Sequence, residues 1–324
     1  MSSMSTGTAP PVDALSGLRG DPRRQRRERV IRTIFATTAI LSVVVSALII
    51  VSLFGGALNF LREVELSKLL PWNVDGWFPR RNEFDLLTLF YGTLVVTVVA
   101  IVIAGPVGLG AAVYLSEYAR PRVRRLLKPI LEVLAGVPSV VLGFFAISFL
   151  NPAIVKNLWH TAAFFNLMVA GIAVGILTIP LIASISEDAM RAVPGSLREA
   201  AYGLGSRKRT TVLRIVLPAA LSGIVAAFIL GVSRAIGETM VVAIASGATG
   251  GSLRPPLGDV ATAALGPGQT MTAAMAALGV GTDQVRGAGP AFQSLFFVGL
   301  LLFVITLTLN VISARIVQRF QERY

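Results

Sequence analysis

Two ionisable residues, Arg234 and Glu238, stand inside a long apolar stretch of the sequence, residues 219–246. A charge at the centre of a bilayer costs about 2.5–3.5 kcal/mol on insertion scales, so such residues usually face a water-filled path or a partner. The fork of donors on an arginine matches the geometry of phosphate-like oxyanions. The pair therefore predicts an anion-binding position within a membrane-spanning helix.

A spacing of four residues would place Arg234 and Glu238 on one helix face, within reach of each other. The simplest alternative is an ion pair that only neutralises itself. Arginine before glutamate is the less favourable order for such a pair, given the helix dipole. We therefore expect both residues to lie on a substrate pathway, where Glu238 balances Arg234 when no substrate is bound.

A polar, basic island covers residues 196–218 and reads SLREAAYGLGSRKRTTVLRIVLP. Ser196 and Glu199 have the spacing of a capping box, which predicts a helix that starts one residue after the serine. Gly203 and Gly205 then offer a stop, because glycine readily adopts the left-handed conformation that follows a helix end. A second basic segment compatible with a helix runs to the end of the island. The loop is therefore predicted to be ordered.

Motifs for catalysis are absent from the sequence. There is no G-x-x-x-x-G-K-[ST] stretch, so the chain does not bind ATP through a P-loop. H-E-x-x-H and G-x-S-x-G are also missing. The chain has no cysteine, and its single histidine, His160, cannot form a metal cluster alone. We expect no enzyme activity, cofactor or metal in this chain, so that any ATP would be used by another subunit.

Composition identifies the class of protein. The 324 residues are 54% hydrophobic and 14% charged, with a mean hydropathy of +0.73, whereas soluble domains carry about 25% charged residues. A membrane helix needs about 20 apolar residues. We predict an all-α integral membrane protein with six transmembrane helices, at residues 33–54, 86–115, 129–150, 164–186, 219–246 and 292–314.

Lysines and arginines are unequally distributed between the two sides of these spans. Of the 29, 21 lie in the two tails and in the loops at 116–128 and 187–218, seven lie in the other loops, and Arg234 lies within a span. Cytoplasmic loops carry the excess of positive charge. We expect both termini and the 196–218 loop to be cytoplasmic. This distribution accounts for the net charge of +12 without a nucleic acid partner.

The segment ahead of the first span, residues 1–32, is expected to be a disordered, basic cytoplasmic tail. Residues 1–20 are rich in Ser, Gly, Pro and Ala and are predicted to be disordered. Residues 21–32 would meet anionic lipid headgroups or act as a stop signal that fixes orientation. The first span is expected to be an uncleaved anchor.

Two external segments are expected. In residues 55–85, Trp72 and Trp77 fit an aromatic belt at the membrane interface. Residues 247–291 form a long loop that either re-enters the membrane in part or caps the outer mouth. Proline and glycine inside the spans, including Gly171-x-x-x-Gly175, indicate close-packed and slightly broken helices.

The polar island resembles a known signature at every defined position. This signature is the EAA motif of permease subunits of bacterial ABC importers, the binding-protein-dependent inner-membrane components. The matching residues are Glu199, Ala200, Ala201, Gly205, Ile215, Leu217 and Pro218. The resemblance implies that the loop forms a coupling helix that docks on a cytoplasmic ATPase. Glu199 would be a docking contact, and the alanines and glycine would be small enough for close approach.

Four further stretches are similar to phosphate-specific permeases: AAVYLSEYARP, LAGVPSVVLG, RAVPGSLREAAYGLG and SRAIGETMVV. The similarity covers roughly residues 86–320, and GETM and GQTMTAAMA look more like the C subunit (PstC-like) than the A subunit. It implies a type I ABC-importer permease fold, with Arg234 and Glu238 in the phosphate pathway.

The same resemblance implies the partners. These would be a second permease subunit (PstA-like), two copies of a cytoplasmic ATPase that uses ATP and Mg, and an extracytoplasmic phosphate-binding protein, in the bacterial cytoplasmic (inner) membrane. The expected domains are an anchor with its external segment (33–85), a permease domain (86–318) that contains the coupling loop, and a tail (319–324).

Two alternatives stay open. The first is an ABC permease for another oxyanion, such as sulfate or molybdate. The second is a proton-coupled secondary carrier in which Glu238 titrates, and the EAA motif disfavours it.

Overall fold

The computed structural model describes residues 22–69, 76–251, 260–279 and 289–320. The expected disorder of residues 1–20 and the expected interfacial position of Trp72 lie outside these residues, as do residues 321–324 of the predicted tail. The chain divides into two units, Met1–Ser52 and Leu53–Tyr324.

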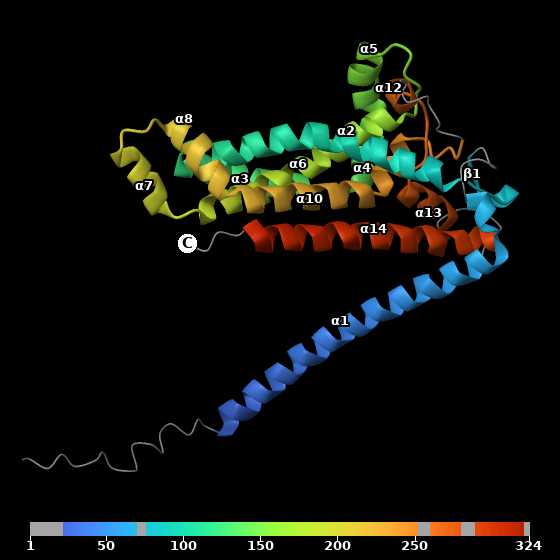
Figure 1. Cartoon of the computed structure of the whole chain (residues 1–324), viewed down its shortest axis with the longest axis horizontal. Coiled ribbons are helices and arrows are strands. Elements are labelled where there is room, and N and C mark those ends of the chain that lie inside the picture. The colour runs from blue at the N-terminus through green and yellow to red at the C-terminus, as the bar shows by residue number, and fades with distance from the viewer. Residues whose placement is uncertain (1–21, 70–75, 252–259, 280–288, 321–324) are drawn as a thin grey trace, which may run out of the picture. The chain divides into compact units, whose positions relative to one another are not determined.

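The described chain is mainly helical, with a single two-stranded sheet among the described residues (Figure 1). Short 3₁₀ and π segments carry the label η. The elements are α1 (Pro22–Glu63), η2 (Leu66–Leu69), β1 (Trp77–Phe78), η3 (Pro79–Arg81), β2 (Glu83–Phe84), α2 (Leu86–Val113), η4 (Tyr114–Tyr118), α3 (Pro121–Ala135), α4 (Ser139–Phe145), η5 (Ala146–Val155), α5 (Lys156–Leu158), α6 (Leu167–Ala192), α7 (Gly195–Gly203), α8 (Lys208–Thr211), η6 (Val212–Val216), α9 (Leu217–Ala219), α10 (Leu221–Gly237), α11 (Met240–Ala245), α12 (Val260–Ala264), α13 (Met271–Gly279) and α14 (Pro290–Phe320).

The first unit contains most of α1. This helix begins at Pro22, so the basic residues after it are helical and not part of a disordered tail as predicted. Large apolar side chains such as Phe35 and Val43 are exposed on it. An apolar helix surface of this kind is suited to lipid.

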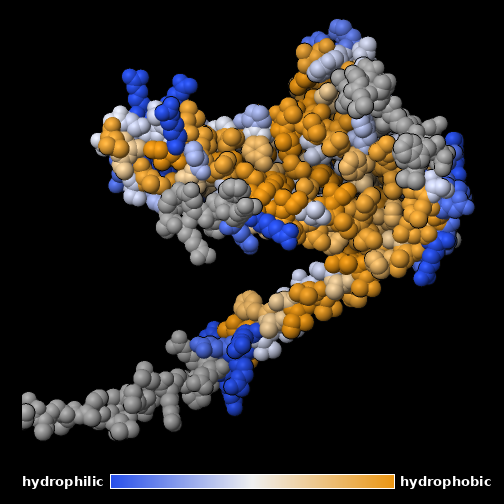
Figure 2. Space-filling view, in the orientation of Figure 1, coloured by the Kyte–Doolittle hydropathy of each residue, from blue (hydrophilic) through white to orange (hydrophobic). Residues whose placement is uncertain are grey.

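Five described helices are long and apolar enough to cross a membrane, and a bent pair of helices can form a sixth span. The bent pair is Lys208–Ala219 and Leu221–Gly237, which meet at 69°. In the second unit, Figure 2 shows a mainly hydrophobic surface over the long helices and hydrophilic side chains at the end formed by α7 and α8. The prediction of an all-α membrane protein is confirmed.

The third span does not run from residue 129 to 150 as predicted. Its first residues belong to a separate helix, α3, and the candidate span is Ser139–Leu158. Pro138 has an extended ψ of 128°, and a residue before proline is disfavoured in the helical region, so the helix ends before this point. Apolar residues continue across the break, which is why the sequence looked like one helix.

Helices α2 and α6 pack closely along much of their lengths. A Cβ atom at Gly171 would lie 2.6 Å from Val99 Cβ, and one at Gly175 would lie 3.0 Å from the carbonyl oxygen of Ala100. The predicted close-packing role of Gly171-x-x-x-Gly175 is therefore confirmed. Asn166 starts α6 by accepting a 2.7 Å hydrogen bond from Val169 N.

Gly171→Ala should lower the stability of the protein by about 1–3 kcal/mol, the usual cost of overpacking a core. Gly110→Ala in α2 is the matched control, because nothing lies within 4 Å of a Cβ atom there. Thermal unfolding in detergent should show a lower midpoint for the first variant alone. Equal midpoints for the two variants would contradict the packing argument.

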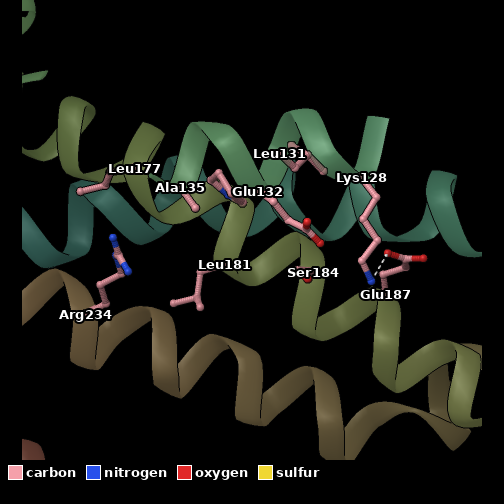
Figure 3. A pocket seen from close by; sticks show the side chains of 10 residues that line it. Lys128, Leu131, Glu132, Ala135, Leu177, Leu181, Ser184, Glu187 and Arg234 are labelled. Atoms are coloured by element: carbon pink, nitrogen blue, oxygen red, sulfur yellow. Dashed lines mark ion pairs between the residues drawn. The ribbon is translucent and has the colours of Figure 1, made fainter. Parts of the chain in front are cut away.

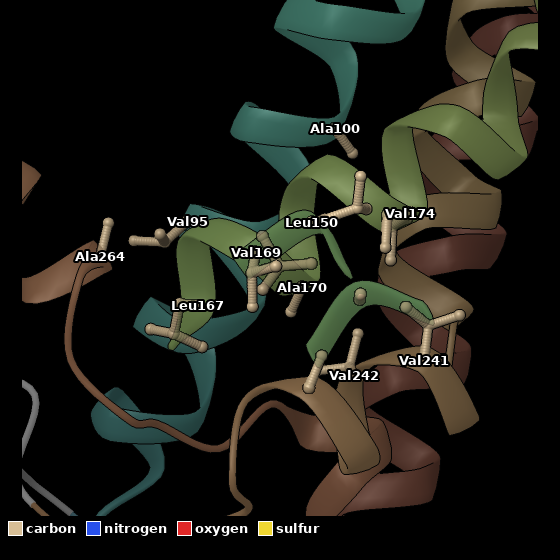
Figure 4. Packing of buried hydrophobic residues seen from close by; sticks show 14 of the residues in the cluster. Val95, Ala100, Leu150, Leu167, Val169, Ala170, Val174, Val241, Val242 and Ala264 are labelled. Atoms are coloured by element: carbon tan, nitrogen blue, oxygen red, sulfur yellow. The ribbon is translucent and has the colours of Figure 1, made fainter. Parts of the chain in front are cut away.

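The main core lies between α2, η5, α6 and α11 (Figure 4). Its labelled members include Val95, Leu150, Val174 and Val242, which come from these four elements and are all buried. A second cluster, with Met190, links the end of α6 to α9 and α10. Helices α6 and α10, which carry part of the candidate site, are thus held by packed cores, whereas α3 has no buried residue.

The described parts of the two segments predicted to be external pack against the rest of the second unit. Trp77 is 2% exposed and packs edge-on against Phe84, so its expected position in an interfacial belt is wrong. The described parts of the 247–291 loop include α12 and α13. Met271 and its three successors in α13 are buried, and α13 contacts α2, α11 and α14.

Candidate functional site

Arg234 lies in the last turn of α10 and lines a cavity of about 240 Å³ (Figure 3). Its side chain has no ion-pair partner among the described residues. The cavity is bounded by α3, α6 and α10, with Lys128, Leu131, Glu132, Ala135, Leu177, Pro180, Leu181, Ser184 and Glu187 as the other lining residues. The predicted anion-binding arginine therefore faces a space that a small anion can occupy.

Glu238 does not share a helix face with Arg234, which corrects the prediction. The helix ends at Gly237, and Glu238 has an extended backbone (φ −69°, ψ 126°). Its carbonyl oxygen accepts a 2.7 Å hydrogen bond from Thr272 Oγ1 of α13, and its carboxylate lies 3.5 Å from Val241 N. The break after α10 thus has its own hydrogen bonds, and among the described residues no ion pair joins Glu238 to Arg234.

A buried carboxylate connects α3 to α6 at the other end of the cavity. Glu187 is fully buried and pairs with Arg124 Nε and, at 3.4 Å, with Lys128 Nζ. Lys128 also donates a 2.9 Å hydrogen bond to Asp188, and this bond raises the pKa of Lys128 above its ordinary value. Sequence reasoning missed this cluster, because the partners are about 60 residues apart.

The 196–218 loop contains the helix that was predicted, but the helix starts at a different residue. Helix α7 begins at Gly195 after Pro194, and no side chain caps its first turn. The predicted capping box of Ser196 and Glu199 is therefore wrong, because Ser196 lies inside the first turn and not before it.

The predicted stop at Gly205 is confirmed. Gly205 has φ +77° and donates a 2.9 Å hydrogen bond to the carbonyl oxygen of Tyr202, while Ser206 N donates to Ala201 O at 3.0 Å. These two bonds form a Schellman motif, which satisfies the last carbonyl groups of α7. The chain then continues into α8, η6 and α9 up to Ala219, as the basic helix-compatible segment predicted.

Arg198 fastens α7 to the ends of two long helices. Its guanidinium donates to Val193 O at 2.7 Å and to Met190 O at 2.8 Å, at the C-terminal end of α6. It also pairs at 2.9 Å with Glu117, whose side chain is 6% exposed and lies in η4 at the end of α2. The S-x-x-E pattern predicted roles for Ser196 and Glu199 and gave no signal for Arg198, which lies between them.

The seven signature residues are not all on the surface. Glu199, Ala200, Gly205 and Pro218 are exposed, Ile215 and Leu217 are partly buried, and Ala201 is buried within the subunit. Ala201 is therefore not available for contact with a partner. Leu204 is 89% exposed beside Gly205, and it adds an apolar side chain that the prediction did not include.

Among the described residues, no group of three His, Asp or Glu side chains is placed to hold a metal ion. The described site offers a cavity with an arginine at one end and a protruding helix, α7, beyond the other end of α6. This arrangement is suited to binding a small anion and to receiving a partner.

Residues 104–324 match the family described as "Binding-protein-dependent transport system inner membrane component". The phosphate transport system permease protein PstC 1 of Mycobacterium tuberculosis is 34% identical over 254 residues, with 73% of each chain covered. PstC of Xylella fastidiosa is 30% identical over 303 residues, covering 86% of this chain and 88% of its own. The probable ABC transporter permease protein YqgH of Bacillus subtilis is 30% identical, covering 70% of this chain and 74% of its own.

Two solved structures have the same fold. A chain of the MetNI methionine ABC transporter, in an inward-facing conformation, has a TM-score of 0.52 at 19% identity and covers 73% of this chain and 94% of its own. A chain of a bacterial ABC transporter that imports alginate has a TM-score of 0.57 at 14% identity, with 92% and 100% covered. The family match extends over more than half of the sequence, and the chain belongs to the binding-protein-dependent transport system inner membrane components.

Proposed function

We propose that this chain is one of two permease subunits in an ATP-driven importer of inorganic phosphate. The observation that carries the proposal is Arg234, whose guanidinium lines a cavity without an ion-pair partner in the described part of the chain. Relatives named as phosphate transport permeases, 30–34% identical over most of the chain, narrow the anion to phosphate. Arginine suits this substrate because its planar donors match an oxyanion.

The coupling role of α7 belongs to the same proposal. Glu199 is exposed on α7 and Leu204 is exposed at its end. Arg198 connects the same helix to Glu117 by a hydrogen bond. An exposed charge beside an exposed leucine is suited to a partner with an apolar groove and a complementary charge. The partner would be a cytoplasmic ATPase, present in two copies, with a second permease subunit and an external phosphate-binding protein completing the importer.

Transport would follow alternating access. When the ATPase moves α7, the hydrogen bonds of Arg198 transmit that movement to the ends of α2 and α6. Helix α6 lines the cavity of Arg234, so movement at the coupling end changes the surroundings of the bound anion. In this arrangement α7 and both termini are cytoplasmic, and the exposed apolar surface of α1 contacts membrane lipids.

Uptake in vesicles that contain the complete transporter tests this function. Radiolabelled phosphate should enter only when ATP is supplied, and an excess of sulfate or molybdate should not compete. Competition by either anion would assign a different oxyanion. Uptake driven by a proton gradient without ATP would overturn the proposal in favour of a secondary carrier.

A further inference from the structure

The cavity of Arg234 continues along the interface between α3 and α6. At one end of the cavity Lys128 pairs with Glu187. From there toward Arg234, the residue numbers of the lining side chains increase along α3 and decrease along α6. The two helices are therefore antiparallel along the cavity. Glu132 lies about one helical turn after Lys128 on α3, and Ser184 lies almost one turn before Glu187 on α6. Glu132 and Ser184 therefore lie at the same level of the cavity.

Figure 3 shows the side chain of Glu132 extending from α3 between the positions of Arg234 and Lys128. Glu132 is exposed, and in the described part of the chain its carboxylate makes no hydrogen bond or ion pair. It thus differs from Glu187, which has two cationic partners. A carboxylate that points into the cavity of an anion-binding arginine needs an explanation, because an ionised carboxylate only accepts hydrogen bonds and repels anions.

Two side chains with hydrogen-bond donors, Ser184 and Lys128, line the same cavity. The hydroxyl group of Ser184 lines the cavity and can donate. Lys128 has three N–H donors, and two of them are directed to Asp188 and Glu187. A tetrahedral oxyanion at this level would find a serine, an ammonium group and the carboxylate of Glu132, while the neighbouring carboxylate of Glu187 is paired with Arg124 and Lys128.

We propose that Glu132, with Ser184 and Lys128, forms a second anion position in this cavity, where Glu132 accepts a hydrogen bond from the hydroxyl group of hydrogen phosphate. The proposal rests on the proposed function, since it concerns the path of the anion that Arg234 binds. It makes Glu132 a residue that determines specificity between oxyanions.

The chemistry of the anions gives the reason. At neutral pH phosphate always keeps at least one proton on oxygen, whereas sulfate keeps none. Hydrogen phosphate can donate to Glu132, and sulfate can only be repelled by it. Sites that use a hydrogen bond to a substrate hydroxyl discriminate by about 10⁴–10⁵ when fully enclosed. Because Glu132 is exposed to solvent, a smaller factor, at least about tenfold, is expected here.

The test measures binding to the purified transporter, assembled from both permease subunits and the ATPase but without the external binding protein, which would impose its own selectivity. Broadening of the ³¹P resonance of inorganic phosphate reports weak binding, and titration with sulfate gives the ratio of the two affinities. In the native transporter sulfate should compete poorly. Glu132→Gln should lower the preference for phosphate at least tenfold.

Three further measurements complete the design. Glu132→Ala removes the carboxylate without adding an amide and should give the same change, which protects the test if the first variant fails to assemble. Glu65→Gln is the matched control, because Glu65 is exposed and does not line the cavity. ATP-driven phosphate uptake by the native protein is measured in parallel.

The outcomes separate the two proposals. An unchanged preference in both Glu132 variants, or no phosphate-dependent broadening in the native protein, would overturn the second anion position alone, provided that native phosphate uptake is normal. If the native transporter takes up no phosphate, the proposed function fails first.

Discussion

Arg234→Gln is expected to reduce ATP-driven phosphate uptake about 100-fold. A hydrogen bond to a charged group contributes about 1.5–3 kcal/mol, and arginine offers two in parallel to an oxyanion. Glutamine is shorter than arginine, keeps one N–H₂ donor group and removes both the charge and the planar fork. The measurement is the initial rate of radiolabelled phosphate uptake in vesicles that contain the complete transporter.

Arg234 is suited to this test because its loss should not disturb the fold. The side chain is exposed and has no ion-pair partner in the described ranges. Arg234→Lys is the matched variant, which keeps the charge and loses the planar fork, so intermediate uptake is expected. Unchanged uptake by the glutamine variant would remove Arg234 from the anion pathway.

The position of Arg234 could be predicted from the sequence, whereas its surroundings could not. A charge in an apolar stretch is visible in the sequence because of its cost in a membrane. The sequence did not predict that the helix ends at Gly237, because apolar residues lie both before and after the break. The hydrogen bond from Thr272, 34 residues later in the chain, accompanies this break and depends on the tertiary fold.

The same contrast holds for the 196–218 loop. The stop at Gly205 depends on the local conformation of one glycine, so the sequence was sufficient. The contact between Arg198 and Glu117 joins residues 81 positions apart. Charge patterning shows that such residues exist and does not show which of them meet. The pairing of Glu187 with Arg124 was missed for the same reason.

Glu199→Lys is expected to reduce phosphate uptake to background, a loss of about 100-fold or more. The side chain is exposed on α7, and among the described residues it makes no hydrogen bond or ion pair, so the folded subunit should insert normally. Losing one partner of a charge pair buried in an interface costs about 2–5 kcal/mol, and reversing the charge adds repulsion. Uptake is measured in vesicles, and retention of the ATPase is measured by co-purification in detergent.

Glu65→Lys controls for the change of charge itself, because Glu65 is an exposed glutamate outside the coupling loop. This variant should retain both uptake and the ATPase. If Glu199→Lys keeps the ATPase and normal uptake, α7 is not the coupling element. If it loses uptake but keeps the ATPase, Glu199 acts in transmitting movement and not in holding the partner. The bonds of Arg198 to the ends of α6 and α2 would then be the route by which that movement reaches the cavity.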